Sequence, residues 1–118
     1  MHKRTSVAIA AFVAVLLIGC ASASTYPAAT HNYNIAGAAY KVAFDKIQNL
    51  RSIGKVNDAQ WAQFVTGAAM ERAADNLVAA DLNAWKVTGK EPPTYAADWQ
   101  SLQDAQAAVI ALSNGVSL

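Results

Sequence analysis

Few residues in this 118-residue chain have the types and spacing that acid–base chemistry needs. The nearest approach to a catalytic pair is Glu71 and Asp75, which are one helical turn apart and would share a helix face. Arg72 lies beside them, so we expect a solvated, charged face here rather than a paired acid and base. The sequence therefore predicts no catalytic residue and favours a protein that is not an enzyme.

Ligands for a metal or a cofactor are equally scarce. Cys20 is the one cysteine, and His2 and His31 are the two histidines, so no paired Cys or His ligand set can form. His31 is expected to be an exposed histidine in a linker. The sequence has no glycine-rich phosphate loop and no Ser/His/Asp set. We therefore predict that the protein binds no metal and no cofactor.

The charge balance restricts the partners to be expected. Nine Lys and Arg residues and eight Asp and Glu residues give a net charge of +1. Because this leaves no surplus of cations to neutralise phosphates, nucleic acid is not an expected partner. Charged residues make up 14% of the chain and hydrophobic residues 54%, over a length that suits one domain.

The first twenty residues have the pattern of an export signal. Lys3 and Arg4 precede an uninterrupted apolar run from Val7 to Ile18. A membrane-spanning helix needs ~20 apolar residues, so this run is too short to span a bilayer, but it suits the apolar region of a signal peptide.

Leu17, Ile18, Gly19 and Cys20 close this run and resemble the lipobox of bacterial lipoproteins. In that family the cysteine sulfur receives a diacylglycerol, a dedicated peptidase cuts before the cysteine, and the new amino group is usually acylated. The resemblance implies cleavage between Gly19 and Cys20 and a lipid anchor on Cys20. Because Ala21 replaces the aspartate that retains such lipoproteins in the inner membrane, it also implies the periplasmic face of the outer membrane in a Gram-negative host.

A second cleavage site competes with the lipobox. The run Ala21-Ser22-Ala23 has the A-x-A pattern of ordinary signal peptidase, which would cut after Ala23 and release a soluble secreted protein. With the lipobox interpretation, the chain divides into a signal peptide (1–19), a lipidated cysteine with a flexible tether rich in Ser, Thr, Ala and Pro (20–33), and a helical domain (34–118).

Three helices are expected in the domain, at about 35–53, 58–88 and 95–113. Alanine, the strongest helix former, makes up close to a quarter of the chain, and the sequence has no alternating β-branched run long enough for a strand. The expected caps and stops are Asn34 and Gly54, then Asn57 with Gln60 as a capping box and Gly89, then Thr94 and Asn114 with Gly115. The predicted fold is an all-α, three-helix antiparallel hairpin or bundle with a long central helix.

The central helix has an apolar face that changes direction. On a helical wheel, the apolar residues of its first half are centred about 120° around the helix from those of its second half. The first group is Trp61, Phe64, Val65 and Ala68, and the second is Leu77, Val78, Leu82 and Trp85. Three explanations remain open: the other two helices pack on different sides of it, it kinks near Gly67, or one face binds another molecule. Gly67 and the alanines around it are expected to permit close helix packing rather than to line a binding groove.

Trp85 and Trp99 are expected to meet in the core, since the third helix returns beside the second. If exposed, they would be the first candidates for contact with a partner, because tryptophan is enriched at binding hot spots.

The sequence as a whole favours a lipid-anchored protein of the bacterial envelope that acts as a non-enzymatic protein-interaction module. Its expected partners are the membrane, through the anchor, and an envelope or phage protein or a second copy of the chain. In overall plan the chain also resembles small lipoproteins carried by phages and prophages, some of which block superinfection while others act in lysis. Two alternatives remain. One is a phage or prophage lipoprotein that acts in superinfection exclusion or in lysis, and the other is a soluble secreted helical protein cleaved after Ala23.

Overall fold

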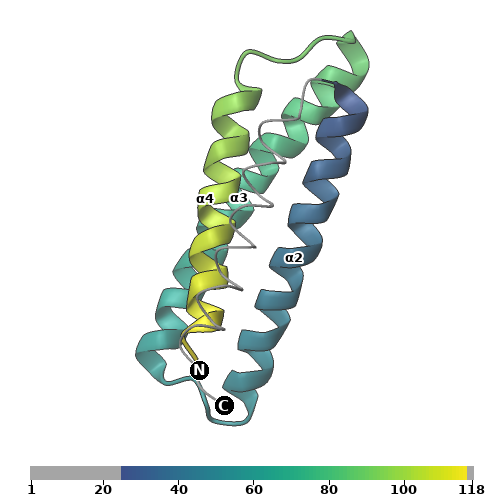
Figure 1. Cartoon of the computed structure of the whole chain (residues 1–118). Helices are drawn as coiled ribbons and strands as arrows, with labels where there is room; N and C mark the ends of the chain where they lie inside the picture. Colours follow the sequence, from purple (N-terminus) through teal and green to yellow (C-terminus); the bar gives the residue numbers. More distant parts are fainter. Residues whose placement is uncertain (1–24, 117–118) are drawn as a thin grey trace.

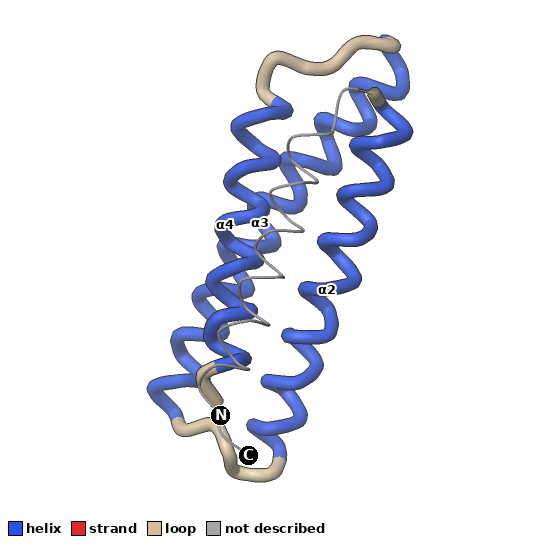
Figure 2. Tube along the Cα trace, in the orientation of Figure 1, coloured by secondary structure: helices blue, strands red, loops and turns tan. Residues whose placement is uncertain are grey.

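The computed structural model describes residues 25–116, which form three α-helices joined by two short connections (Figures 1 and 2). Helix α2 spans Tyr26–Ser52, α3 spans Asp58–Thr88 and α4 spans Tyr95–Asn114. Successive helices run in opposite directions and pack side by side, α3 most extensively against α4. The fold is therefore an all-helical antiparallel bundle with a long central helix, as the sequence predicts.

Helix α2 begins well before its predicted start. Thr25 is its N-cap, with Oγ1 accepting a hydrogen bond from the Ala28 backbone N–H at 3.3 Å. Pro27 occupies the first turn, where the N–H that proline lacks would have no helical partner. The predicted cap at Asn34 is therefore wrong, because a Ser/Thr/Pro-containing segment that suits a linker is equally suited to start a helix.

The tether predicted for residues 20–33 is wrong from residue 26 onward for the same reason. Ala29 has no exposed surface and packs in the core with Tyr26 and Tyr33 against it. His31 is exposed, as expected, but it lies on α2 rather than in a linker. The folded domain therefore begins closer to Cys20 than the sequence predicts.

The connection from α2 to α3 follows its local sequence signals. Gly54 has a φ of +78°, and the N–H groups of Gly54 and Lys55 donate to the carbonyls of Arg51 and Leu50, which is a Schellman motif. Asn57 Oδ1 accepts from the Gln60 N–H at 2.8 Å, and Gln60 Oε1 accepts from the Asn57 N–H at 2.9 Å. The predicted capping box is confirmed.

The other end of α3 and the start of α4 at Tyr95 are also confirmed, whereas the expected side-chain cap of α4 is absent. Gly89 ends α3 with a φ of +73°, and its N–H donates to the Trp85 carbonyl at 2.8 Å. Thr94 precedes α4 but makes no side-chain cap hydrogen bond. Its Oγ1 instead donates to Asp81 Oδ1 at 2.8 Å, because that carboxylate is buried and needs a donor.

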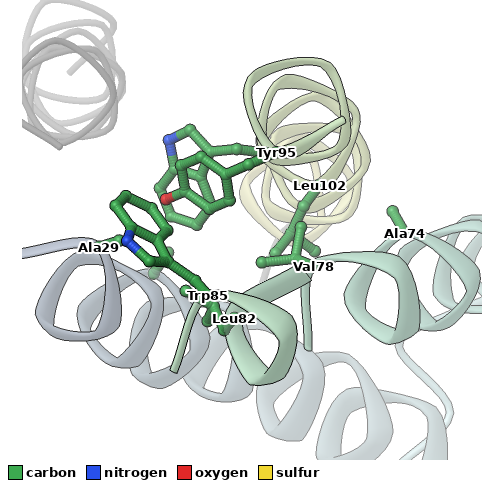
Figure 3. Packing of buried hydrophobic residues seen from close by; sticks show 9 residues of the cluster. Ala29, Ala74, Val78, Leu82, Trp85, Tyr95 and Leu102 are labelled. Carbon is green, nitrogen blue, oxygen red and sulfur yellow. The ribbon is translucent and has the colours of Figure 1, made fainter. Parts of the chain in front are cut away.

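Two apolar clusters form the core of the bundle. The upper cluster in Figure 1 joins the start of α2, the end of α3 and the start of α4 (Figure 3). It contains Ala29, Ala36, Ala74, Val78, Leu82, Trp85, Tyr95, Trp99 and Leu102. The lower cluster lies around the α2–α3 turn and the end of α4, and contains Ile47, Leu50, Val56, Phe64 and Val109.

The buried face of α3 is one continuous stripe, so the predicted change of direction is wrong. Phe64, Glu71, Val78 and Trp85 are buried at seven-residue intervals, and α3 continues through Gly67 without a break. The apolar pattern of the sequence misplaced the buried face of α3 because Glu71 is charged yet buried, whereas Leu77 is apolar yet 52% exposed. Neither a kink nor packing on two different sides is needed to explain the sequence pattern.

Candidate interaction surface

Of the two carboxylates that first suggested chemistry, Glu71 is buried in the bundle and Asp75 is half-buried. Glu71 is buried between the two apolar clusters, and its Oε1 accepts a hydrogen bond from Gln106 Nε2 at 3.4 Å. Asp75 accepts a bond from Tyr33 Oη at 2.7 Å. Arg72 is exposed, as expected. The predicted solvated face is wrong for the two carboxylates, because other helices supply polar partners that the sequence of one helix cannot reveal.

These groups form a polar layer that joins all three helices. Burial raises the pKa of Glu71 above its ordinary value, and the neighbouring Asp75 carboxylate acts in the same direction. Burial, together with the negative charges of Glu71 and Asp75, raises the pKa of Tyr40 to about 12. Polar groups that find partners at one alignment of the helices disfavour other alignments. We therefore infer that this polar layer fixes the register of the three helices.

Trp85 and Trp99 are both buried, in agreement with the expectation that they belong to the core. The Tyr95 ring centroid lies 5.2 Å from that of Trp85 (Figure 3). It lies 6.3 Å from the ring centroid of Trp99. The proposal that either is a contact site for a partner is wrong, because their side chains are enclosed by the chain itself.

A second polar cluster lies beside these aromatic rings. Asp81 is buried and accepts the hydrogen bond from Thr94, and it is also close to Asp98 on α4. A hydrogen bond with Asp81 raises the pKa of Asp98. This cluster fastens the start of α4 to α3. Within residues 25–116, no group of three or more His, Cys, Asp or Glu side chains is placed to hold a metal ion.

The lipidation and cleavage residues predicted at Gly19 and Cys20 lie outside the described residues, as does the competing Ala21-Ser22-Ala23 site. Among the helices that the structure describes, none combines the length and apolar character needed to cross a membrane.

The surface feature that sequence analysis did not single out is a row of residues on the outward face of α3, which we call the outer stripe. Its members are uncharged, exposed and separated alternately by three and four residues. They are Gln63, Thr66, Met70, Ala73, Leu77, Ala80, Ala84 and Val87. Met70, Leu77 and Val87 expose 63%, 52% and 77% of their surface. The alternating spacing is visible in the sequence, but one sequence does not show which of two apolar faces the other helices cover.

An apolar groove between α3 and α4 adjoins the outer stripe. Two neighbouring hollows, of about 330 and 560 Å³, share Gly67, Met70 and Ala108 in their walls. Gly67 permits this close approach, since a Cβ atom there would lie 3.1 Å from Val109 Cγ2. The small residues thus allow close helix packing, as expected, but they also line a groove, which the sequence analysis set aside. Among the described residues that line one hollow or the other, Asp104 in the smaller one alone carries a charge.

Comparison with known proteins gives no match: no family model, curated protein or solved structure is similar to this chain. Inferences about its role therefore rest on its own residues and their arrangement.

Proposed function

We propose that the protein is a lipid-anchored lipoprotein of the bacterial envelope whose helical domain acts by binding another protein rather than by catalysis. The observation that carries the proposal is the outer stripe, an uncharged face of α3 from which Met70, Leu77 and Val87 project into solvent. An exposed apolar stripe with this spacing is typical of a helix that packs against another helix. Asp75, Asp81 and Glu71 each accept a hydrogen bond from a side chain on another helix or at its start, which supports a structural role for them.

The proposed anchor would hold the domain close to a membrane. If Cys20 carries the lipid, residues 21–25 connect it to α2 and can span at most ~17 Å. The end of the bundle that holds Trp85 and Tyr95 would then lie within that distance of the lipid surface, because α2 begins at that end. Confinement near a membrane raises the effective concentration of the domain for partners on the same surface. Two or three acyl chains would make this attachment durable.

The intact mass of the mature protein from a membrane fraction tests the anchor. We expect a product that begins at Cys20 and carries a diacylglycerol, with or without a further acyl chain. The Cys20→Ala variant should lack this product. A soluble wild-type product that begins at Ser24 would overturn the anchor, since it would mean that cleavage follows Ala23.

A further inference from the structure

We propose that the outer stripe binds a second copy of this chain, with the two α3 helices antiparallel and related by a two-fold axis that passes opposite residue 75. The proposal rests on the interaction module proposed above and names its partner. It follows from the spacing, the side-chain sizes and the charges of the stripe.

The spacing suits a long contact between two helices. The stripe runs from Gln63 to Val87, which corresponds to ~36 Å at 1.5 Å per residue. Residues that repeat every seven positions drift by ~20° per heptad on a straight helix, and two such helices stay in contact by winding into a left-handed supercoil. The buried stripe of α3 has the same seven-residue repeat, so both faces of this helix favour the same winding.

The side-chain sizes favour the antiparallel arrangement. With the axis opposite residue 75, Met70 of one copy faces Ala80 of the second copy, and Leu77 faces Ala73 of the second copy. At the centre of the contact each large side chain thus meets an alanine, which allows close packing there, while Gln63 and Val87 face each other at its two ends. A parallel pair would set Met70 against Met70 and Leu77 against Leu77, with alanine pairs between them. The distance between the two helix axes would then have to change from one pair to the next.

The outer edge of the stripe is also uncharged. The exposed residues along that edge are Ala62, Ala69, Asn76 and Asn83. The charged groups of a partner with a charged surface would lose their hydration against this edge and would find no opposite charge to offset that cost. A second copy of the chain instead brings the same uncharged face. On the α4 wall of the groove, Asp104 is exposed and accepts a hydrogen bond from Gln100 at 2.9 Å, so its charge stays solvated at the rim.

The available area is close to what a specific interface needs. The outer stripe and the adjoining α4 wall form a face of ~36 Å by ~20 Å, or roughly 700 Å² on each copy. Specific protein–protein interfaces bury about 800 Å² on each partner. The antiparallel arrangement also places the two Tyr26 ends at opposite ends of the dimer. If both copies are anchored to one membrane, the dimer therefore lies along its surface.

Disulfide cross-linking of the full-length protein in its native envelope tests both the contact and its direction. We expect the Met70→Cys/Ala80→Cys double variant to form a covalent dimer on mild oxidation, because these positions face each other in the antiparallel pair. Neither single variant should do so. The Val42→Cys variant is the matched control, since Val42 is 72% exposed but lies on α2. A double variant that stays monomeric, or a Met70→Cys variant that cross-links to itself as readily, would overturn the proposal.

The same experiment in a Cys20→Ser background separates this proposal from the anchor. We expect the cross-link in both backgrounds, since the stripe is far along the chain from Cys20. Lipid on Cys20 without a 70–80 cross-link would overturn the dimer and leave the anchor standing. The cross-link without lipid on the wild-type Cys20 would overturn the anchor and leave the dimer standing.

Discussion

Glu71 links the stability of the core to pH. Because burial raises its pKa in the folded state, the folded protein binds a proton there more tightly than the unfolded chain does. The carboxylate thus opposes folding at neutral pH, and this cost falls as the pH falls through the folded pKa toward the ordinary value of 4.5. Each unit of pKa difference corresponds to about 1.4 kcal/mol.

Glu71→Gln should therefore stabilise the protein at pH 7, because glutamine keeps the shape without the buried charge. The difference in Tm from wild type should shrink as the pH is lowered toward 4.5. Asp45→Asn is the matched control, since Asp45 forms an exposed-face ion pair with Lys41 at 2.8 Å. Thermal unfolding followed by circular dichroism across this pH range measures both effects. A Glu71→Gln variant that is less stable than wild type at pH 7 would contradict the assignment.

Two glycines should respond to alanine in opposite directions. Gly89 has a φ of +73°, which alanine adopts at a cost of about 1 kcal/mol, so Gly89→Ala should destabilise the protein. Gly37 lies within α2 with open space around the position of a Cβ atom, so Gly37→Ala should stabilise it by a similar amount. Chemical denaturation gives both free energies of unfolding. Equal signs for the two variants would be inconsistent with these backbone conformations.

At the scale of the helices, the sequence predicts best what is decided locally. The capping box at Asn57 and Gln60 and the stops at Gly54 and Gly89 depend on neighbouring residues, and all are present in the structure. The first two turns of α2 were missed, since their composition suits a linker and their stability comes from the packing of Ala29.

Ala29 gives a direct test of where α2 begins. Ala29→Lys should destabilise the protein by more than about 2 kcal/mol, because the position is fully buried in the upper cluster and a charged side chain cannot be accommodated there. His31→Lys, two residues away and exposed, should change the free energy of unfolding by less than about 0.5 kcal/mol. Two equally stable variants in chemical denaturation would mean that this segment is a tether after all.

The faces of α3 show why the candidate surface could not be predicted fully. Its sequence contains two stripes with a seven-residue repeat, one through Phe64 and Val78 and the other through Met70 and Leu77. The first is buried although it includes Glu71, because Gln106 on α4 supplies a polar partner. Which stripe becomes the core depends on contacts between helices, so a single sequence leaves the choice open.

At the scale of the whole molecule, α2 and α4 cover one stripe of α3 and leave the other exposed. A bundle of this size has little interior, so a second helical contact adds a substantial fraction of its buried surface. We therefore link the exposed stripe to assembly and the lipobox resemblance to location. The first concerns α3 and the second concerns Cys20, and each can be tested without the other.

The molar mass of the full-length protein in detergent solution, measured by sedimentation over a range of protein concentrations, shows whether the outer stripe joins two copies of the chain. Wild type should be a dimer, and Leu77→Lys should be a monomer with unchanged helix content, because Leu77 is half exposed in one copy and a charge there would be buried between two. Val42→Lys, equally charged but on α2, should remain a dimer. A wild-type protein that is monomeric at every concentration, or a Leu77→Lys variant that stays dimeric, would contradict the account.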